Sequence, residues 1–100
     1  MEIEIPFNKW SKDRLKANMK TATSRNKKYG DPGDTFTVEG LKYCLTQITK
    51  VSLSSIRDCC YDVEGCRSPE HFEKVWIDIH PRKGWVDEQK VWFHRFEKIN

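Results

Sequence analysis

One short segment concentrates groups that could do chemistry. Residues 20–25 read Lys-Thr-Ala-Thr-Ser-Arg and bring a cation, two threonine hydroxyls and a guanidinium together. The small and β-branched residues predict a strand, and alternate positions of a strand share a face, so Thr21, Thr23 and Arg25 should point the same way. Cations and hydroxyls of this kind contact phosphate and sugar groups. We therefore interpret the segment as a candidate ligand site.

Positive charge gathers around this segment. The chain has a net charge of +3, whereas residues 9–28 alone hold eight Lys and Arg residues against a single acid, Asp13. Such a field attracts phosphates, so we expect an anionic partner. Arg25, Lys27 and Lys28 border a predicted loop and are candidate contacts to that partner, together with Thr21. Three other lysines are equally well explained as the solvated face of a helix: Lys9, Lys12 and Lys16.

The elements that must position these groups follow a β, α, β, β, β, α, α, β order, which indicates one α+β domain. The clearest is a helix over residues 69–79, with Ser68 as its N-cap, Pro69 at its first position and apolar residues at helical spacing. The other expected elements are a strand at 3–7, a basic helix over 8–19, strands at 20–25, 35–38 and 41–53, a short helix over 54–60 and a closing strand at 90–99.

Two of these strands indicate a small bent barrel. Residues 41–53 carry two apolar sets on opposite parities, which predicts a bulge or a change of register. Residues 90–99 are apolar on both faces, which is typical of a central strand.

Cysteine usage and hydropathy favour a cytoplasmic protein. The chain has four cysteines, no export signal and no apolar run near the roughly 18 residues that span a membrane, so we expect free thiols and no membrane. Cys60, Cys66 and His71 could be placed around zinc, but no C-x2-C pair is present and the adjacent Cys59 and Cys60 would point apart. We therefore expect neither a metal nor a cofactor.

The order of these motifs resembles that of the ASCH domains, relatives of the PUA domains. A helix followed by Lys20-x4-Arg25, then Gly33-Asp34 before a strand, a strand at 48–51 and a closing strand at 91–96 cover nearly the whole chain. The family usually has a glycine two residues before the lysine, where this chain has Asn18, a residue that tolerates positive φ. The resemblance implies a single ASCH-like domain over residues 1–100, a small PUA-like β-barrel with flanking helices.

Within that family the chain is most similar to small bacterial amidohydrolases of acetylcytidine. They share the Lys-Thr-x-Thr-x-Arg strand, a glutamate ahead of a helix, here Glu64, and an Ile-x-Pro ending, here residues 79–81. The resemblance implies Lys20 and Thr23 as base and nucleophile, with Glu64 as a third polar group. A lysine can act as that base only if burial or a nearby cation such as Arg25 lowers its pKa.

The arrangement of this pair is left open by the sequence. On a regular strand Lys20 and Thr23 point to opposite faces, so Lys20 must lie in the entering turn or the strand must bulge. Alternatively, Thr23 is an ordinary strand hydroxyl, and Lys20 and Glu64 form a solvent-exposed ion pair. Glu64 could also hold the amide edge of a cytosine or shuttle a proton.

Three functions follow from these residues. The first is binding of RNA or a modified nucleoside, with hydrolysis of an N-acylated cytidine amide as the reaction. The second is a non-catalytic RNA-binding module in translation or RNA metabolism, in which Lys20, Arg25, Lys27 and Lys28 contact phosphates. The third is regulation through a protein partner. Three aromatic residues are candidates to stack on a base: Trp10, Tyr43 and Tyr61.

Overall fold

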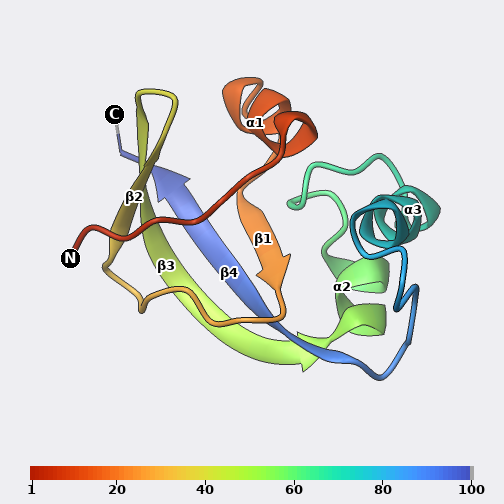
Figure 1. Ribbon diagram of the computed structural model, residues 1–100. Helices are drawn as coiled ribbons and strands as arrows, with labels where there is room; N and C mark the ends of the chain where they lie inside the picture. The colour runs from red at the N-terminus through yellow and green to blue at the C-terminus, as the bar shows by residue number, and fades with distance from the viewer. Residues whose placement is uncertain (100) are drawn as a thin grey trace.

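A curled antiparallel sheet of four strands forms the centre of the protein, whose computed structural model describes residues 1–99 (Figure 1). The strand order is β1-β4-β3-β2. The central position of β4, between β1 and β3, agrees with its apolar residues on both faces. The strands are β1 (Ala22–Arg25), β2 (Thr35–Val38), β3 (Leu41–Ser52) and β4 (Lys90–Lys98).

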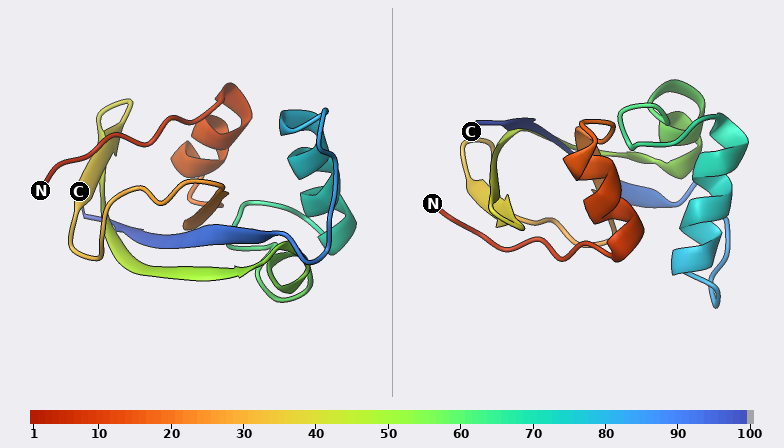
Figure 2. Two further views of the ribbon diagram at one scale, coloured as in Figure 1. Left: turned by 60° about the horizontal axis from the view of Figure 1, so that its bottom comes forward. Right: turned by 90° about the horizontal axis from the view of Figure 1, so that it is seen from above.

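The long strand β3 bends the sheet. Its pairing with β4 shifts register between Leu45 and Gln47, so the predicted bulge is confirmed. Tyr43 and Leu45 before the bulge and Ile48 after it pack into the same interior, although their positions differ in parity. The bulge thus lets both apolar sets of β3 be buried while the sheet curls into a half-barrel (Figure 2).

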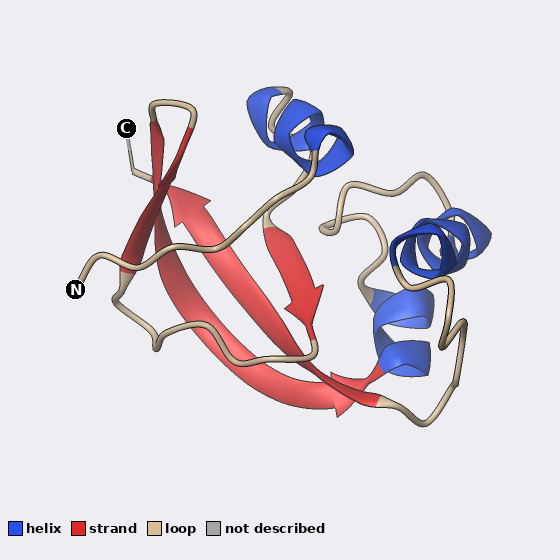
Figure 3. Cartoon of the chain, viewed as in Figure 1, coloured by secondary structure: helices blue, strands red, loops and turns tan. Residues whose placement is uncertain are grey.

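Two apolar cores lie along this sheet, one toward each of its ends. Inside the curl, Phe36, Tyr43 and Phe96 contact one another with ring centroids 5.2–5.4 Å apart, and the helix α1 (Lys9–Lys16) adds Leu15. Toward the other end the helices α2 (Leu53–Cys59) and α3 (Pro69–Ile79) pack with β4 around Phe93 (Figure 3). The fold therefore matches the predicted α+β class with flanking helices.

The helix ends follow from their capping residues. Ser68 accepts a hydrogen bond from the His71 N–H at 3.1 Å and starts α3 at the predicted residue. Asn8 caps α1 in the same way at 2.8 Å, but this helix ends at Lys16 rather than Met19 because Asn18 adopts a positive φ of 58°. None of the helices in residues 1–99 is long and apolar enough to cross a membrane.

The predicted strand at residues 3–7 is wrong. This segment forms a single bridge, Glu2 with Thr35, and the Ile3 N–H donates to the Thr35 carbonyl at 2.7 Å. The chain then leaves the short strand β2 and crosses toward α1 (Figure 1). Pro6, which has no N–H to donate, lies on this diverging path. Ile3 and Ile5 alternate with polar residues because they pack into the half-barrel interior, and not because they belong to a strand of the sheet.

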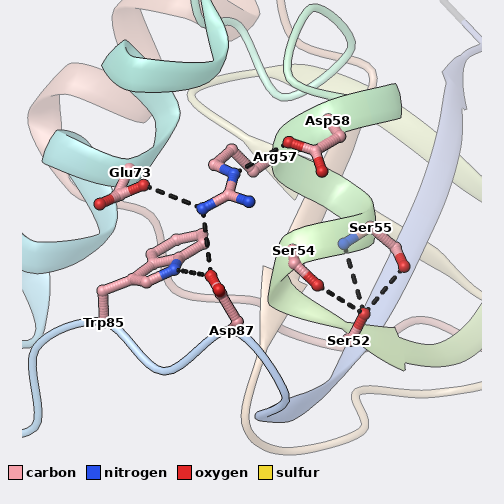
Figure 4. A network of polar contacts seen from close by, with 8 residues as sticks. All are labelled: Ser52, Ser54, Ser55, Arg57, Asp58, Glu73, Trp85 and Asp87. Atoms are coloured by element: carbon pink, nitrogen blue, oxygen red, sulfur yellow. Dashed lines mark hydrogen bonds and ion pairs between the residues drawn. The ribbon is translucent and has the colours of Figure 1, made fainter.

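An ion-pair network joins α2, α3 and the loop before β4 (Figure 4). The Arg57 guanidinium donates to Asp58 at 2.9 Å and to Glu73 and Asp87 at 3.1 Å each. The Trp85 indole N–H donates to the same Asp87 carboxylate at 2.6 Å. Arg57 therefore links α2 to α3 through Glu73 and to the loop before β4 through Asp87, and backbone hydrogen bonds from Leu53 and Ser54 also join the start of α2 to that loop.

Asn18 gives the fold a direct test. An L-residue in the left-handed region is strained by about 1 kcal/mol or more, and asparagine tolerates that region better than alanine does. We expect Asn18→Ala to lower the free energy of unfolding by about 1 kcal/mol, and Asn18→Gly not to lower it. Urea denaturation of the three proteins measures this. Equal stability of Asn18→Ala and the wild type would contradict the assigned backbone conformation.

Candidate functional site

A cavity of about 370 Å³ lies between α1, α3 and β1, with the loop before α3 at its base. The helices α1 and α3 stand on the same side of the sheet, opposite each other (Figure 2). The walls of the cavity are largely aromatic and apolar, and its polar groups come mainly from β1 and the loop before α3. The aromatic rings lining it belong to Phe7, Trp10, Phe72, Trp76 and His80.

The polar floor is a buried ion pair. Lys20 Nζ donates to Glu64 Oε1 at 3.1 Å and to the Glu64 carbonyl at 3.0 Å, and the Ser24 hydroxyl donates to Glu64 Oε2 at 2.5 Å. The side chains of Lys20 and Glu64 are 4% and 5% exposed. The alternative of a solvent-exposed pair is therefore wrong. Two charges removed from water need such hydrogen bonds to offset their lost hydration.

Thr23 and Arg25 reach the same cavity from the other face of β1. Arg25 Nε donates to Thr23 Oγ1 at 3.1 Å, and the guanidinium lies 4.8 Å from the centre of the Phe7 ring. Burial lowers the pKa of Arg25 from its usual value. Lys20 lies before β1, in the turn that enters the strand, which is one of the two arrangements that the sequence left open. Its side chain therefore lines the same cavity as Thr23. Among residues 1–99, no hydrogen bond joins Lys20 to the Thr23 hydroxyl.

The loop before α3 positions Glu64. The Val63 carbonyl accepts hydrogen bonds from the N–H groups of Thr21 at 2.7 Å and Ala22 at 3.0 Å, which fixes the loop against the start of β1. Gly65 follows with a φ of 92°, and a Cβ there would lie 3.2 Å from the Cβ of Arg14. A glycine is therefore needed for the close approach that brings Glu64 to Lys20.

His94 supports Thr23 from the neighbouring strand. It is fully buried and stands opposite Thr23 in the β1–β4 ladder. Its Nδ1 lies 3.2 Å from the Thr23 carbonyl, and its Nε2 accepts the Tyr29 N–H at 3.0 Å. An imidazole that accepts at Nε2 is neutral and donates from Nδ1, and burial correspondingly lowers the pKa of His94. The ring thus links β1, β4 and the loop after β1.

Cys66 adds a thiol to the cavity wall. It is buried, and burial raises its pKa to about 11, so the group is a neutral thiol at physiological pH. All four cysteines are free. Cys60, Cys66 and His71 do not gather around a common point, since no group of three or more ligating residues in positions 1–99 could hold a metal ion. His71 Nδ1 instead accepts the Arg67 N–H at 3.0 Å.

Three of the predicted ligand contacts lie outside the cavity. Thr21 is exposed, and its backbone rather than its hydroxyl joins the structure. Lys27 and Lys28 are on the exposed loop after β1, where Lys28 pairs with Asp31 at 2.9 Å. The cavity itself brings together the other predicted residues: Lys20, Thr23, Arg25 and Glu64.

Several cavity residues were missed or misplaced by sequence reasoning. Ser24, which lies within residues 20–25, was missed because its alternation with Thr23 along the strand suggested that its side chain faced away from the ligand. Of the three aromatic candidates only Trp10 lines the cavity. Tyr43 packs in the half-barrel interior, and Tyr61 packs beside α2 and α3.

Comparison with known proteins identifies the fold. No sequence model of a protein family and no curated protein matches this chain. The crystal structure of hypothetical protein PH0355 matches with a TM-score of 0.73 and 21% identity, over 99% of this chain and 100% of that one. An ASCH domain from Lactobacillus crispatus JV V101 matches with a TM-score of 0.70 and 9% identity, over 97% and 77%.

A third match is the solution structure of protein PF0455 from Pyrococcus furiosus, with a TM-score of 0.61 and 20% identity, over 100% of this chain and 99% of that one. The protein therefore has the ASCH fold, and the PUA-like β-barrel with flanking helices that the sequence resemblance predicted takes the form of a curled half-barrel.

The buried imidazole predicts a pH dependence of stability. The pKa of His94 in the folded state lies below the unfolded value of about 6.5, so below that pH the unfolded chain binds a proton that the folded protein does not. We expect the free energy of unfolding to fall as the pH drops from 7 to 5, and His94→Gln to reduce this slope. Denaturant titrations at several pH values test it, and identical slopes in both proteins would contradict the neutral, buried imidazole.

Proposed function

We propose that the cavity binds a nucleoside, free or within RNA, and hydrolyses the amide of an N-acylated cytidine. The observation that carries this proposal is the buried Lys20–Glu64–Ser24 group, which forms the polar floor of a cavity with aromatic walls. A nucleobase needs this combination, because its faces are apolar and its edges carry hydrogen-bond donors and acceptors. The volume of about 370 Å³ falls within the usual range of small-molecule sites.

The polar groups match the edge of an acylated cytosine. A carboxylate has about four acceptor positions, so Glu64 can accept a further hydrogen bond from the amide N–H while Lys20 and Ser24 hold it in place. Arg25 donates from Nε to Thr23 and offers its other guanidinium N–H groups to a carbonyl oxygen. Trp10 lines the cavity and offers an aromatic surface to the base.

The hydrolysis proceeds in two steps. Lys20 first gives a proton to Glu64, the carboxylate it contacts at 3.1 Å, and then takes the proton of the Thr23 hydroxyl as Oγ1 attacks the amide carbonyl carbon. The C–N bond breaks, and the lysine returns the proton to the departing cytidine amine. Water then hydrolyses the acyl-threonine ester, which releases the carboxylic acid and regenerates the hydroxyl. For the first step Lys20 must turn from Glu64 to Thr23, and ligand binding would supply that rearrangement.

Two features support this reaction. The sequence resemblance to acetylcytidine amidohydrolases falls on Lys20, Thr23 and Glu64, and these three residues line one cavity although Glu64 is 44 residues from Lys20. The backbone of Thr23 is also held by His94. A nucleophile needs such support if its position is to be reproducible to within a fraction of an ångström.

A second function is favoured by the hydrogen bonds that Thr23 and Lys20 form. Thr23 Oγ1 accepts a hydrogen bond from Arg25, and Lys20 Nζ is bound to Glu64 through two hydrogen bonds. In this arrangement no base among residues 1–99 accepts the proton of the Thr23 hydroxyl. A non-catalytic module that recognises a nucleotide of RNA would use the same cavity without any rearrangement.

The Thr23 hydroxyl distinguishes the two functions. We expect Thr23→Val to slow release of cytidine from acetylcytidine by at least about 10²-fold, because the isosteric side chain has no nucleophile, and to leave binding within a few-fold. Chromatography follows turnover, and calorimetry follows binding. The matched control is Thr46→Val, the same change at an exposed position of β3.

The outcomes separate clearly. Turnover by Thr23→Val at the wild-type rate would contradict the assigned nucleophile. Binding without turnover by the wild-type protein would favour the non-catalytic module. Absence of both would contradict the proposal that the cavity binds nucleosides.

A further inference from the structure

A second basic and aromatic group lies on the sheet next to the cavity. Trp92 of β4 is partly exposed, with Lys28 Nζ 5.7 Å and Lys50 Nζ 5.3 Å from its ring centroid. Lys50 is its direct partner on β3, whereas Lys28 comes from the loop after β1. Three segments of the chain thus contribute to one surface, which we call the Trp92 patch: Lys28, Lys50 and Trp92.

The Trp92 patch is continuous with the cavity through Arg25. Arg25 lines the cavity and stands directly opposite Trp92 in the β1–β4 ladder. Residues opposite each other in an antiparallel pair share a face, with Cβ atoms about 5 Å apart. A ligand that fills the cavity beside Arg25 and extends along the sheet therefore meets the Trp92 patch next.

The charges of the Trp92 patch are poorly neutralised within the protein. The ion pair of Lys28 with Asp31 joins two exposed side chains, which is a weak interaction in water. Lys50 is exposed and forms no ion pair within residues 1–99. Two ammonium groups near one indole repel each other, and an anion that accepts hydrogen bonds from both would relieve that repulsion.

Indole and ammonium together have the chemistry that binds single-stranded nucleic acid. Such proteins combine cations that contact the phosphates with aromatic rings on which bases stack, and stacking works for any base. Arg25 and Tyr29, whose ring is 5.2 Å from Lys27 Nζ, extend the same alternation of cations and rings. Phosphate contacts position a nucleic-acid strand, whereas a cavity recognises an individual base.

We propose that the substrate is a single-stranded polynucleotide, with one nucleotide in the cavity and the adjacent one on the Trp92 patch. Lys28 and Lys50 bind its phosphate, and Trp92 stacks on its base. This inference rests on the proposed function, since it assigns the base in the cavity to a nucleotide of a chain. It identifies the substrate class as a polymer rather than a free nucleoside.

The test compares an oligonucleotide with a free nucleoside. Fluorescence anisotropy measures binding of a short labelled RNA, and of the DNA of the same sequence, while calorimetry measures binding of acetylcytidine. The variants are Lys28→Ala/Lys50→Ala and Trp92→Leu. The charge-matched control is Lys42→Ala/Lys98→Ala, at the far end of the sheet.

We expect Lys28→Ala/Lys50→Ala to weaken oligonucleotide binding and to reduce the slope of log affinity against log salt by roughly 0.7 per lysine. Trp92→Leu should weaken binding by about 5-fold or more. Acetylcytidine binding should be unchanged in both. A difference between the RNA and DNA arms identifies which polymer is bound.

If the patch variants bind the oligonucleotide as tightly as the control variant does, the inference is overturned. Acetylcytidine binding by the same proteins would show that nucleoside binding in the cavity, and with it the proposed function, still holds. A wild-type protein that binds acetylcytidine but no oligonucleotide would overturn it in the same way. A wild-type protein that binds neither ligand would overturn both proposals.

Discussion

The buried ion pair of Lys20 and Glu64 is the constraint on which the site depends. Two charges that are almost wholly removed from water need several hydrogen bonds, and the surrounding chain supplies them through Ser24 and the Glu64 carbonyl. The loop that carries Glu64 must therefore lie against the start of β1. Gly65 permits that approach, and the Val63 carbonyl secures it through two backbone hydrogen bonds.

Stability alone does not account for this pair. Buried ion pairs contribute little net stability, and apolar side chains of similar size often replace them without loss. Here the pair also lies at the floor of a cavity, where it presents a carboxylate and an ammonium to whatever enters. The two apolar cores and the Arg57 network fix the helices around it, so the charges are held in place before any ligand binds.

Local signals in the sequence predicted most of the fold. The helix at residues 69–79 follows from Ser68, Pro69 and helical spacing, and the bulge in β3 follows from a change of apolar parity. The strand at 3–7 was wrong because alternation alone does not reveal whether a sheet edge is available. The early end of α1 depends on the conformation of Asn18, for which the sequence offered only a tolerance of positive φ.

The site was predicted less completely, because its geometry rests on contacts between distant residues. The resemblance to ASCH domains pointed to Lys20, Thr23, Arg25 and Glu64, which the fold brings to one cavity. His94 is 71 residues from Thr23, and no local pattern indicates that they stand opposite each other. Ser24 was missed because the loop with Glu64 covers the face of β1 that was taken to point away from the ligand.

The most direct test of this account replaces the ion pair by apolar residues and measures ligand binding. We predict that Lys20→Met/Glu64→Leu folds with a stability close to or above that of the wild type, because the desolvation cost of two charges disappears. Calorimetric titration of this folded variant with acetylcytidine should show no binding under conditions in which the wild type binds. Binding of acetylcytidine by the apolar variant with wild-type affinity would contradict the central role of the buried pair.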